Sequence, residues 1–367
     1  MSTKTRHYFV NGIAAQGFID YFASNLQDLE TVTILKGGPG TGKSRFILSV
    51  AAACENKGLE LEYIHCPFDP NTLDGIIVPD LKYTIVDGTA PHCVEPAAPG
   101  AIEEYMNLAA AWDSTKLKAH KDDILNRNRQ ISACYENAQK CFAEGLAVHD
   151  EWEKIYIKNM DFAKADKLTA ETIELLLGDK RLDKAAATKT RFFGTSTPSG
   201  SFDYVESLTA GIPKRYFLKG RPGTGKSTLL KKLVTASTER GFDTEVYHCG
   251  FDANSLDMVI LPELNVCIFD STAPHLYEPT RTSDEIIDLY TKCVKSGTDE
   301  KYRLELLGIS ARYKIAVQRG TRFLADAKKL HDELKMYYME AIDRKKVDAL
   351  CDEEINKLQI LMEQMQF

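Results

Sequence analysis

The sequence repeats itself at a constant spacing of 183 residues, and this repeat constrains the fold more than any other feature. Residues 35–96 align with residues 218–279 without a gap, and roughly half of the aligned positions are identical. The match continues downstream with slightly altered spacing, since ISACY at 131 recurs as ISARY at 309 and HDE at 149 recurs as HDE at 331. The chain therefore contains a duplication, and its 367 residues are enough for two domains.

The duplication predicts two consecutive domains, residues 1–187 and residues 188–367, joined at a polar, alanine-rich stretch. Within each domain, glycine and proline become scarce over about 100–182 and about 284–363, where apolar residues recur at helical spacing. This pattern predicts a helical-hairpin arm on each domain. Two interpretations stay open: each arm packs on itself or its own domain, or the arms dock a protein partner.

The first part of each copy follows a strand, turn and helix pattern. TVTILKG and KRYFLKG are short apolar runs that end in glycine, and each is followed by a helical segment that also closes with glycine. Two further apolar runs follow, one ending in His-Cys and one ending in aspartate. Strands that alternate with helices predict an α/β fold with a parallel sheet and right-handed crossovers.

A glycine-rich motif stands between the first strand and the helix of each copy. GGPGTGKS at 37–44 and GRPGTGKS at 220–227 match the pattern G-x-x-x-x-G-K-[ST], in which backbone N–H groups and a helix N-terminus surround phosphates. The lysines are expected to reach the β- and γ-phosphates, and the serines to place a hydroxyl on Mg²⁺. The residues assigned to nucleotide binding are Gly37, Gly38, Pro39, Gly40, Thr41, Gly42, Lys43 and Ser44, with Gly220, Arg221, Pro222, Gly223, Thr224, Gly225, Lys226 and Ser227.

These motifs carry a resemblance to a known superfamily. Both halves resemble P-loop NTPase domains, and the sequence GxPGTGKS is frequent among AAA-type ATPases and some nucleotide kinases. The whole chain is similar to a bacterial group of double P-loop proteins labelled as ATPases or nucleotide kinases. The resemblance implies two tandem P-loop domains that bind ATP and Mg²⁺, and it leaves the reaction open.

An aspartate ends the last apolar run of each copy. Asp87 and Asp270 lie 44 residues after Lys43 and Lys226, where a Mg²⁺-binding Walker B aspartate is expected; the alternative is a strand-end aspartate that caps a turn. AAA-type ATPases usually follow this aspartate with a water-orienting glutamate, which is missing here. A guanine-reading NKxD motif is also missing, so ATP is favoured over GTP.

Other polar residues follow the second and third runs of each copy. Because strand ends in a parallel sheet face the nucleotide, these residues are expected to cluster near the γ-phosphates. The expected cluster consists of His65, Asp69, Asp74, Asp87, His92 and Glu95, with His248, Asp252, Asp257, Asp270, His275 and Glu278.

Two pairs within this cluster are catalytic candidates beside the loop lysines and strand-end aspartates. Asp69 and Asp252 are interpreted as general bases or ligands of a metal-bound water, or alternatively as Asx-turn or helix-cap residues. His92 and His275 are expected to contact the γ-phosphate, or alternatively to order the Pro-His turn.

Three further roles are weaker hypotheses. Glu95 and Glu278 could supply the missing water-orienting carboxylate. Arg221 or Arg281 could act as an arginine finger. The third hypothesis is a zinc site, with the ligands His65, Cys66 and His92 or their counterparts His248, Cys249 and His275.

The composition of the chain limits the kinds of partner and the compartment that we expect. The formal net charge of −7 gives no overall attraction to nucleic acid or to an anionic membrane, so neither is expected as a partner. The apolar stretches are too short to span a bilayer, the N-terminus lacks the apolar core of a signal peptide, and nine cysteines without a CxxC pair suit a reducing compartment. We expect a cytoplasmic protein.

Three functions fit these features. The leading expectation is Mg²⁺-dependent ATP hydrolysis at two sites that form an intramolecular pseudo-dimer. The alternatives are a nucleotide or small-molecule kinase, and a nucleotide-gated binding module with negligible turnover.

Overall fold

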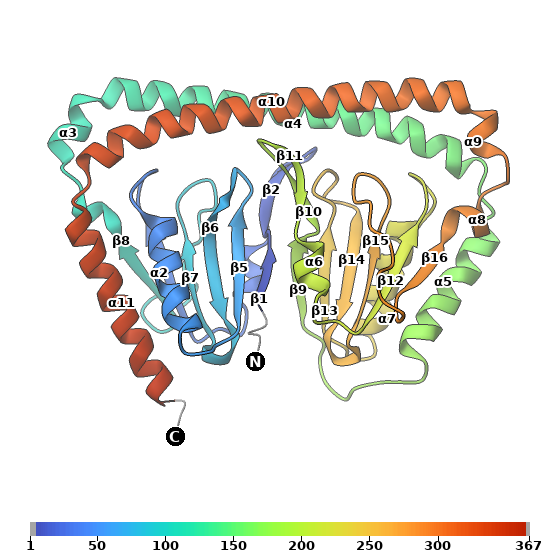
Figure 1. Ribbon diagram of the computed structural model, residues 1–367, viewed down its shortest axis with the longest axis horizontal. Helices are drawn as coiled ribbons and strands as arrows, with labels where there is room; N and C mark the ends of the chain where they lie inside the picture. The colour runs from blue at the N-terminus through green and yellow to red at the C-terminus, as the bar shows by residue number, and fades with distance from the viewer. Residues whose placement is uncertain (1–4, 365–367) are drawn as a thin grey trace. The chain divides into compact units, whose positions relative to one another are not determined.

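The computed structural model describes residues 5–364, which form two compact units (Figure 1). Unit 1 contains the chain through Asn11, residues Asp20–Asn137 and the chain from Arg322 onward. Unit 2 contains Gly12–Ile19 and Ala138–Thr321. Both units are α/β, each with one six-stranded sheet, but neither is one continuous stretch of chain.

The sheet of unit 1 has the strand order β1-β5-β6-β7-β4-β8. Its buried strands are rich in branched apolar residues, and the helix α2 packs on it to form a core that includes Leu35, Ile47 and Ile85. The elements are β1 (Thr5–Tyr8), α1 (Phe22–Asn25), β4 (Thr31–Lys36), α2 (Lys43–Glu55), β5 (Leu61–Cys66), β6 (Asp69–Val78), a 3₁₀ turn (Pro79–Leu81), β7 (Tyr83–Asp87), β8 (Glu103–Asn107), a second 3₁₀ turn (Leu108–Ala111), α3 (Ser114–Ala119) and α11 (Arg344–Gln364).

Unit 2 repeats this plan with the order β9-β13-β14-β15-β12-β16. A small two-stranded sheet, β10-β11, lies in the chain between β9 and the other strands of the main sheet. The hairpin β2 (Asn11–Ala14) and β3 (Gly17–Asp20) lies largely in this unit. The elements are α5 (Phe162–Leu177), β9 (Thr188–Phe192), β10 (Gly194–Thr197), β11 (Gly200–Asp203), α6 (Val205–Thr209), β12 (Lys214–Lys219), α7 (Lys226–Thr238), β13 (Thr244–His248), β14 (Leu256–Leu261), a 3₁₀ turn (Pro262–Leu264), β15 (Val266–Asp270), β16 (Glu285–Asp288), α8 (Leu289–Cys293) and α9 (Thr298–Lys301).

The prediction of a parallel sheet is wrong at one strand of each copy. β6 runs antiparallel to both β5 and β7, and β14 runs antiparallel to β13 and β15, whereas the other pairings of the main sheets are parallel. Only two residues separate β5 from β6, and a single 3₁₀ turn separates β6 from β7. Connections this short cannot make a crossover, so neighbouring strands must run in opposite directions.

The segments expected to begin the helical arms are strands. β8 pairs with β4, and β16 pairs with β12, so each main sheet takes its last strand from a region that the sequence pattern assigned to an arm. The long helices begin later, α4 at Lys121 and α10 at Arg303.

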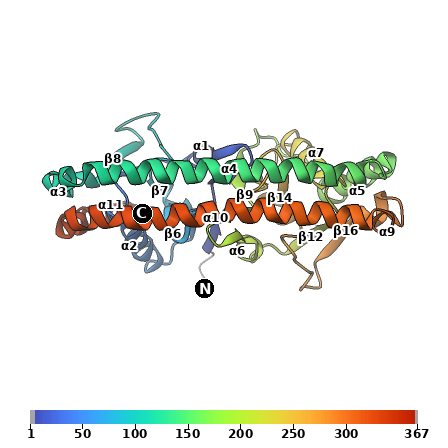
Figure 2. The same ribbon diagram turned by 90° about the horizontal axis from the view of Figure 1, so that it is seen from above.

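Each long helix begins in the unit built on its own repeat and ends in the other unit. α4 (Lys121–Ile157) has 37 residues and α10 (Arg303–Ala341) has 39, which corresponds to roughly 55–60 Å each. In unit 1, Ile131 of α4 is buried with Ala327 and Leu334 of α10. In unit 2 the two helices also lie side by side (Figure 2), with the Phe142 ring against Gly320.

The helix that follows each long helix covers the main core of the other repeat. α11 packs against α2, where Val347, Cys351 and Leu358 join the core of unit 1. α5 packs against α7, where Leu176 and Leu177 join the core of unit 2. The interpretation that each arm packs on its own domain is therefore wrong, because the second helix of each arm belongs to the unit built on the other repeat. Docking of a protein partner stays a prediction.

None of the helices within residues 5–364 has the length and apolar content needed to cross a bilayer.

The exchange of arms predicts where core mutations act. Leu358→Ala in α11 removes a buried side chain from the core of unit 1 and should lower the free energy of unfolding of this unit by roughly 2–5 kcal/mol. Hydrogen exchange should therefore speed up in β4 and α2, although Leu358 belongs to the second repeat. The matched change Leu177→Ala should act on α7, and faster exchange of α7 in Leu358→Ala would contradict the exchanged arrangement.

Candidate functional site

The first glycine-rich loop joins β4 to α2. Gly40 and Gly42 have φ angles of 73° and 95°, a left-handed region that glycine adopts without a Cβ clash. Gly42 is the N-cap of α2, and no side chain forms a cap hydrogen bond there. The first N–H groups of the helix are therefore open to an anionic ligand, and the partial positive charge of the helix N-terminus favours one.

The second loop has the same local geometry between β12 and α7. Gly223 and Gly225 have φ angles of 75° and 90°, and the N-cap Gly225 also lacks a side-chain cap. In both loops a threonine hydroxyl closes the turn: Thr41 donates to the carbonyl of Gly38, and Thr224 to that of Arg221, each at 2.8 Å.

The loop lysines lie beside the strand-end aspartates. Lys43 Nζ is 3.5 Å from Asp87 Oδ2 and donates to the carbonyl oxygens of Gly37 and Gly38 at 3.0 and 2.9 Å. In the second copy, Lys226 Nζ is 3.4 Å from Asp270 Oδ2. The structure thus brings the two motifs of each copy together, because β7 is the direct neighbour of β4, and β15 of β12.

Each strand-end aspartate uses its two oxygens differently. Asp87 Oδ1 accepts a hydrogen bond from the Thr89 amide at 2.8 Å, and Asp270 Oδ1 accepts one from the Thr272 amide at 2.9 Å. One oxygen of each aspartate therefore caps the turn after the strand, and the other lies beside the loop lysine.

The loop serines present their oxygens near the start of the antiparallel strand. Ser44 Oγ accepts a hydrogen bond from the Leu73 amide at 3.0 Å, and Ser227 Oγ accepts one from the Leu256 amide at 2.9 Å. A hydroxyl oxygen has a second lone pair, so each can still serve as a ligand of a hard cation.

A second carboxylate is buried near each strand-end aspartate. Asp74 of β6 and Asp257 of β14 occupy matching positions of the repeat. Burial, together with the charge of Asp87, raises the pKa of Asp74; burial and the charge of Asp270 raise the pKa of Asp257 to about 6. Sequence analysis placed both in the expected cluster without a role, since the strand that holds them was not recognised.

His92 and His275 are held by carboxylates in the interior. His92 Nε2 lies 3.4 Å from Asp74 Oδ2, and His275 Nδ1 lies 2.8 Å from Asp203 Oδ2. Burial lowers the pKa of His275, but the hydrogen bond to Asp203 and the charge of Asp257 outweigh this effect, so its pKa is raised. Both rings are largely buried, which favours ordering of the turn over a direct phosphate contact.

The zinc hypothesis fails in the form that the sequence suggested. His65 does not join Cys66 and His92: its Nδ1 faces the Pro70 carbonyl at 2.9 Å, and its Nε2 lies 2.8 Å from His7 Nδ1. His248 Nδ1 likewise lies 2.6 Å from the Ala253 carbonyl oxygen. The potential ligands that do converge in the first copy are Cys66, Asp74 and His92.

The aspartates after β5 and β13 already have partners. Asp69 Oδ2 is 3.1 Å from Lys328 Nζ of α10. Asp252 accepts hydrogen bonds from the side chain of Gln16 at 2.6 Å and of Ser255 at 2.7 Å, and from the Asn254 amide at 3.1 Å. Asp252 thus forms the Asx turn that sequence analysis gave as the alternative.

The remaining hypotheses on glutamates and arginines gain no support. Glu95 and Glu278 are exposed and pair with Lys36 and Lys219, the lysines that end β4 and β12. Arg221 pairs with Asp299 at 3.0 Å and stacks 4.8 Å from the Tyr290 ring centroid. Arg281 donates to the carbonyl of Ile212 at 2.7 Å, which is a structural contact.

Sequence analysis missed the long helices as part of both sites. Over the first loop, a Cβ added to Gly38 would lie 2.5 Å from the Tyr338 ring, and one added to Gly40 would lie 2.9 Å from the Lys335 carbonyl oxygen. His331 lies one helical turn before Lys335: burial and the charges of Lys335 and Lys43 lower its pKa, to about 4.

The second loop has a matching cover from α4. A Cβ added to Gly223 would lie 2.8 Å from the Glu153 carbonyl oxygen. Burial and the charge of Lys226 lower the pKa of His149. The recurrence of HDE at 149 and 331 was the available signal, because these segments face the two loops; it was used only as evidence of the duplication.

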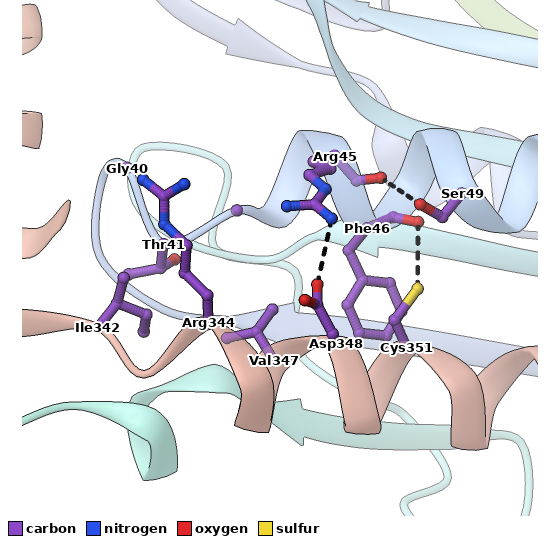
Figure 3. Close-up of a pocket in the computed structure, with 11 residues that line it drawn as sticks. Gly40, Thr41, Arg45, Phe46, Ser49, Ile342, Arg344, Val347, Asp348 and Cys351 are labelled. Carbon is purple, nitrogen blue, oxygen red and sulfur yellow. Dashed lines mark hydrogen bonds and ion pairs between the residues drawn. The ribbon is translucent and has the colours of Figure 1, made fainter.

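A pocket of about 190 Å³ lies beside the first loop (Figure 3). It is lined by Gly40–Gly42 of the loop, the first turns of α2 and the first turns of α11. Arg45 and Arg344 bring two cations to its wall, and Arg45 pairs with Asp348 at 3.4 Å. The helix α11, which belongs to the second repeat, thus forms one wall of a pocket beside the loop of the first repeat.

Comparison of the chain with protein-family models, with curated proteins and with solved structures finds no match in any of the three.

The burial of His331 and His65 predicts that the free energy of unfolding depends on pH. The pKa values of His331 and His65 are lowered to about 4, mainly by burial, so both stay neutral in the folded state while the unfolded chain takes up protons below about pH 6.5. The free energy of unfolding should therefore be highest above pH 6.5 and fall between pH 6.5 and 4, by roughly 1–3 kcal/mol for each histidine.

Urea unfolding of His331→Gln at several pH values checks this expectation. The variant should lose part of the pH dependence, whereas His120→Gln at the exposed end of α3 should behave like the wild type. A variant His331→Gln with an unchanged slope would show that the ring is not held neutral.

Proposed function

We propose that the protein is an ATP-binding, Mg²⁺-dependent P-loop NTPase that hydrolyses ATP, with one site on each glycine-rich loop. One observation carries the proposal: in both copies, a loop with left-handed glycines leads into an uncapped helix N-terminus, and its lysine lies within 3.5 Å of a strand-end carboxylate. Loop amides, a helix N-terminus and a lysine ammonium group are suited to bound phosphates.

The residues present fit the assigned groups. Loop amides and the lysine would hold the β- and γ-phosphates, and the lysine would exchange its loop carbonyl partners for phosphate oxygens. Ser44 with Asp87, and Ser227 with Asp270, offer the hard oxygen ligands that Mg²⁺ prefers. Bound Mg²⁺ would neutralise charge on the phosphates during transfer.

The pocket beside the first loop supports a nucleotide rather than a free phosphate. It continues from the loop along α2, and it combines cationic walls with the apolar side chains of Phe46, Ile342 and Val347. We assign ribose and base to this region. The missing NKxD motif supports adenine over guanine.

Hydrolysis is favoured over transfer to an acceptor hydroxyl by the partners of the candidate bases. Asp69 pairs with Lys328, and Asp252 is engaged by its own turn and by Gln16. The kinase hypothesis needs one of these aspartates to change partners.

The two-site proposal predicts the stoichiometry of binding. Isothermal titration with ATP and Mg²⁺ should give two molecules per wild-type chain, one for Lys43→Ala or Lys226→Ala, and none for the double variant, because each change removes the phosphate-binding ammonium of one loop. Phosphate release should be absent in the double variant.

Three outcomes separate the alternatives. Phosphate release without any acceptor supports hydrolysis. ADP formation that requires an added hydroxyl or nucleotide acceptor would point to a kinase instead. Two bound ATP molecules with no turnover in either assay would leave a nucleotide-gated binding module.

A further inference from the structure

The two loops are nearly identical, but the helices that cover them differ in charge at matched positions. Aligned 182 residues apart, the two arms share the sequence HDE, whereas Leu146, Glu153 and Phe162 correspond to Lys328, Lys335 and Arg344. Over these three positions the formal charge is −1 in the helices of the first repeat and +3 in those of the second. Because the arms are exchanged, Glu153 belongs to the unit with the second loop.

Glu153 lies directly on the second loop. A Cβ added to Gly223 would lie 3.0 Å from Glu153 Cβ. Burial and the charges of Asp150 and Asp252 raise the pKa of Glu153, and the nearby Lys226 and Gly223 amide offset this effect only in part. His149 Nδ1 is 3.8 Å from Glu153 Oε1. The carboxyl group thus lies beside a loop amide of the kind that would bind phosphate.

The first loop has a cation at the matching position. Lys335 Nζ pairs with Asp332 at 3.0 Å, and Lys328 pairs with both Asp332 at 2.9 Å and Asp69 at 3.1 Å. The nearby arm carboxylate is therefore bound to two ammonium groups, which leaves it unsuited to orient water. The added cations instead favour a bound polyphosphate.

We propose that the two sites are not equivalent: the second site hydrolyses ATP with Glu153 as the carboxylate that positions the attacking water, and the first site retains ATP. The inference rests on the proposed ATPase function and names the residue that replaces the missing glutamate after Asp270. Phosphate binding to the loop engages the Gly223 amide beside Glu153. The carboxylate then lies next to the γ-phosphate and accepts a hydrogen bond from a water molecule.

The reaction at the second site is an ordinary hydrolysis. The water oxygen forms a bond to the γ-phosphorus while the bond from that phosphorus to the β–γ bridging oxygen breaks. One proton of the water passes to Glu153 and from there to the released phosphate or to solvent, and ADP and inorganic phosphate leave. At the first site, no arm residue among those described takes the place of Glu153, because Lys335 stands there.

The test compares Glu153→Gln with Glu151→Gln in the full-length chain. Both changes remove one carboxylate from α4, but Glu151 pairs with Arg312 away from the loop. Glu153→Gln should lower the rate of phosphate release by about 100-fold, as expected for loss of a water-activating group, while still binding two ATP molecules. Glu151→Gln should turn over like the wild type.

Identification of the nucleotide that stays bound to each lysine variant shows which of the two sites hydrolyses ATP. After mixing with ATP, removal of free nucleotide and acid quenching, Lys226→Ala should contain ATP at its first site, and Lys43→Ala should contain ADP at its second. Wild-type turnover in Glu153→Gln, or conversion to ADP in Lys226→Ala, would overturn the asymmetry while leaving the ATPase proposal intact. A wild-type chain that binds no ATP would overturn both.

Discussion

Burial of the apolar stripes of α4 and α10 is the constraint on which the rest of the structure depends. A helix of almost forty residues with one apolar stripe is not stable alone in water, since most helical stability comes from packing of that stripe. In unit 1 the stripe of α4 is covered by α10 around Ile131, Ala327 and Leu334, and in unit 2 the two helices pair again around Phe142 and Gly320. Each helix therefore continues past its own sheet, and its C-terminal half contacts the loop of the other repeat.

This arrangement gives each site two sources of residues. The loop, the strand-end aspartate and the serine come from one repeat, and they reproduce the same geometry twice because left-handed glycines fix the backbone. The histidine and the charged residues that cover the loop come from the other repeat. The helix that contacts each loop begins in one unit and ends in the other.

The sequence was sufficient for the parts of the site that depend on local geometry. The repeat spacing and the loop motif located Lys43, Asp87 and their counterparts, because a strand, a glycine turn and a helix N-terminus are encoded by adjacent residues. β6 was not recognised, since GIIVPD follows polar residues and lacks the alternation of a half-buried strand. The exchange of arms could not be predicted, because helical periodicity shows which face of a helix is buried and not which chain segment covers it.

The same distinction explains where duplicated sites can diverge. A Cβ added to Gly40 or Gly223 would meet backbone atoms at less than about 3 Å, and both residues have positive φ, so glycine suits this position in both copies. At Gly40 and Gly223 the covering helix touches the loop through backbone and Cβ atoms, so the rest of the covering side chain can change charge without moving the loop. Glu153 and Lys335 occupy one such position. A duplicated chain with exchanged arms can therefore keep two loops of equal backbone geometry and still give them different electrostatic surroundings.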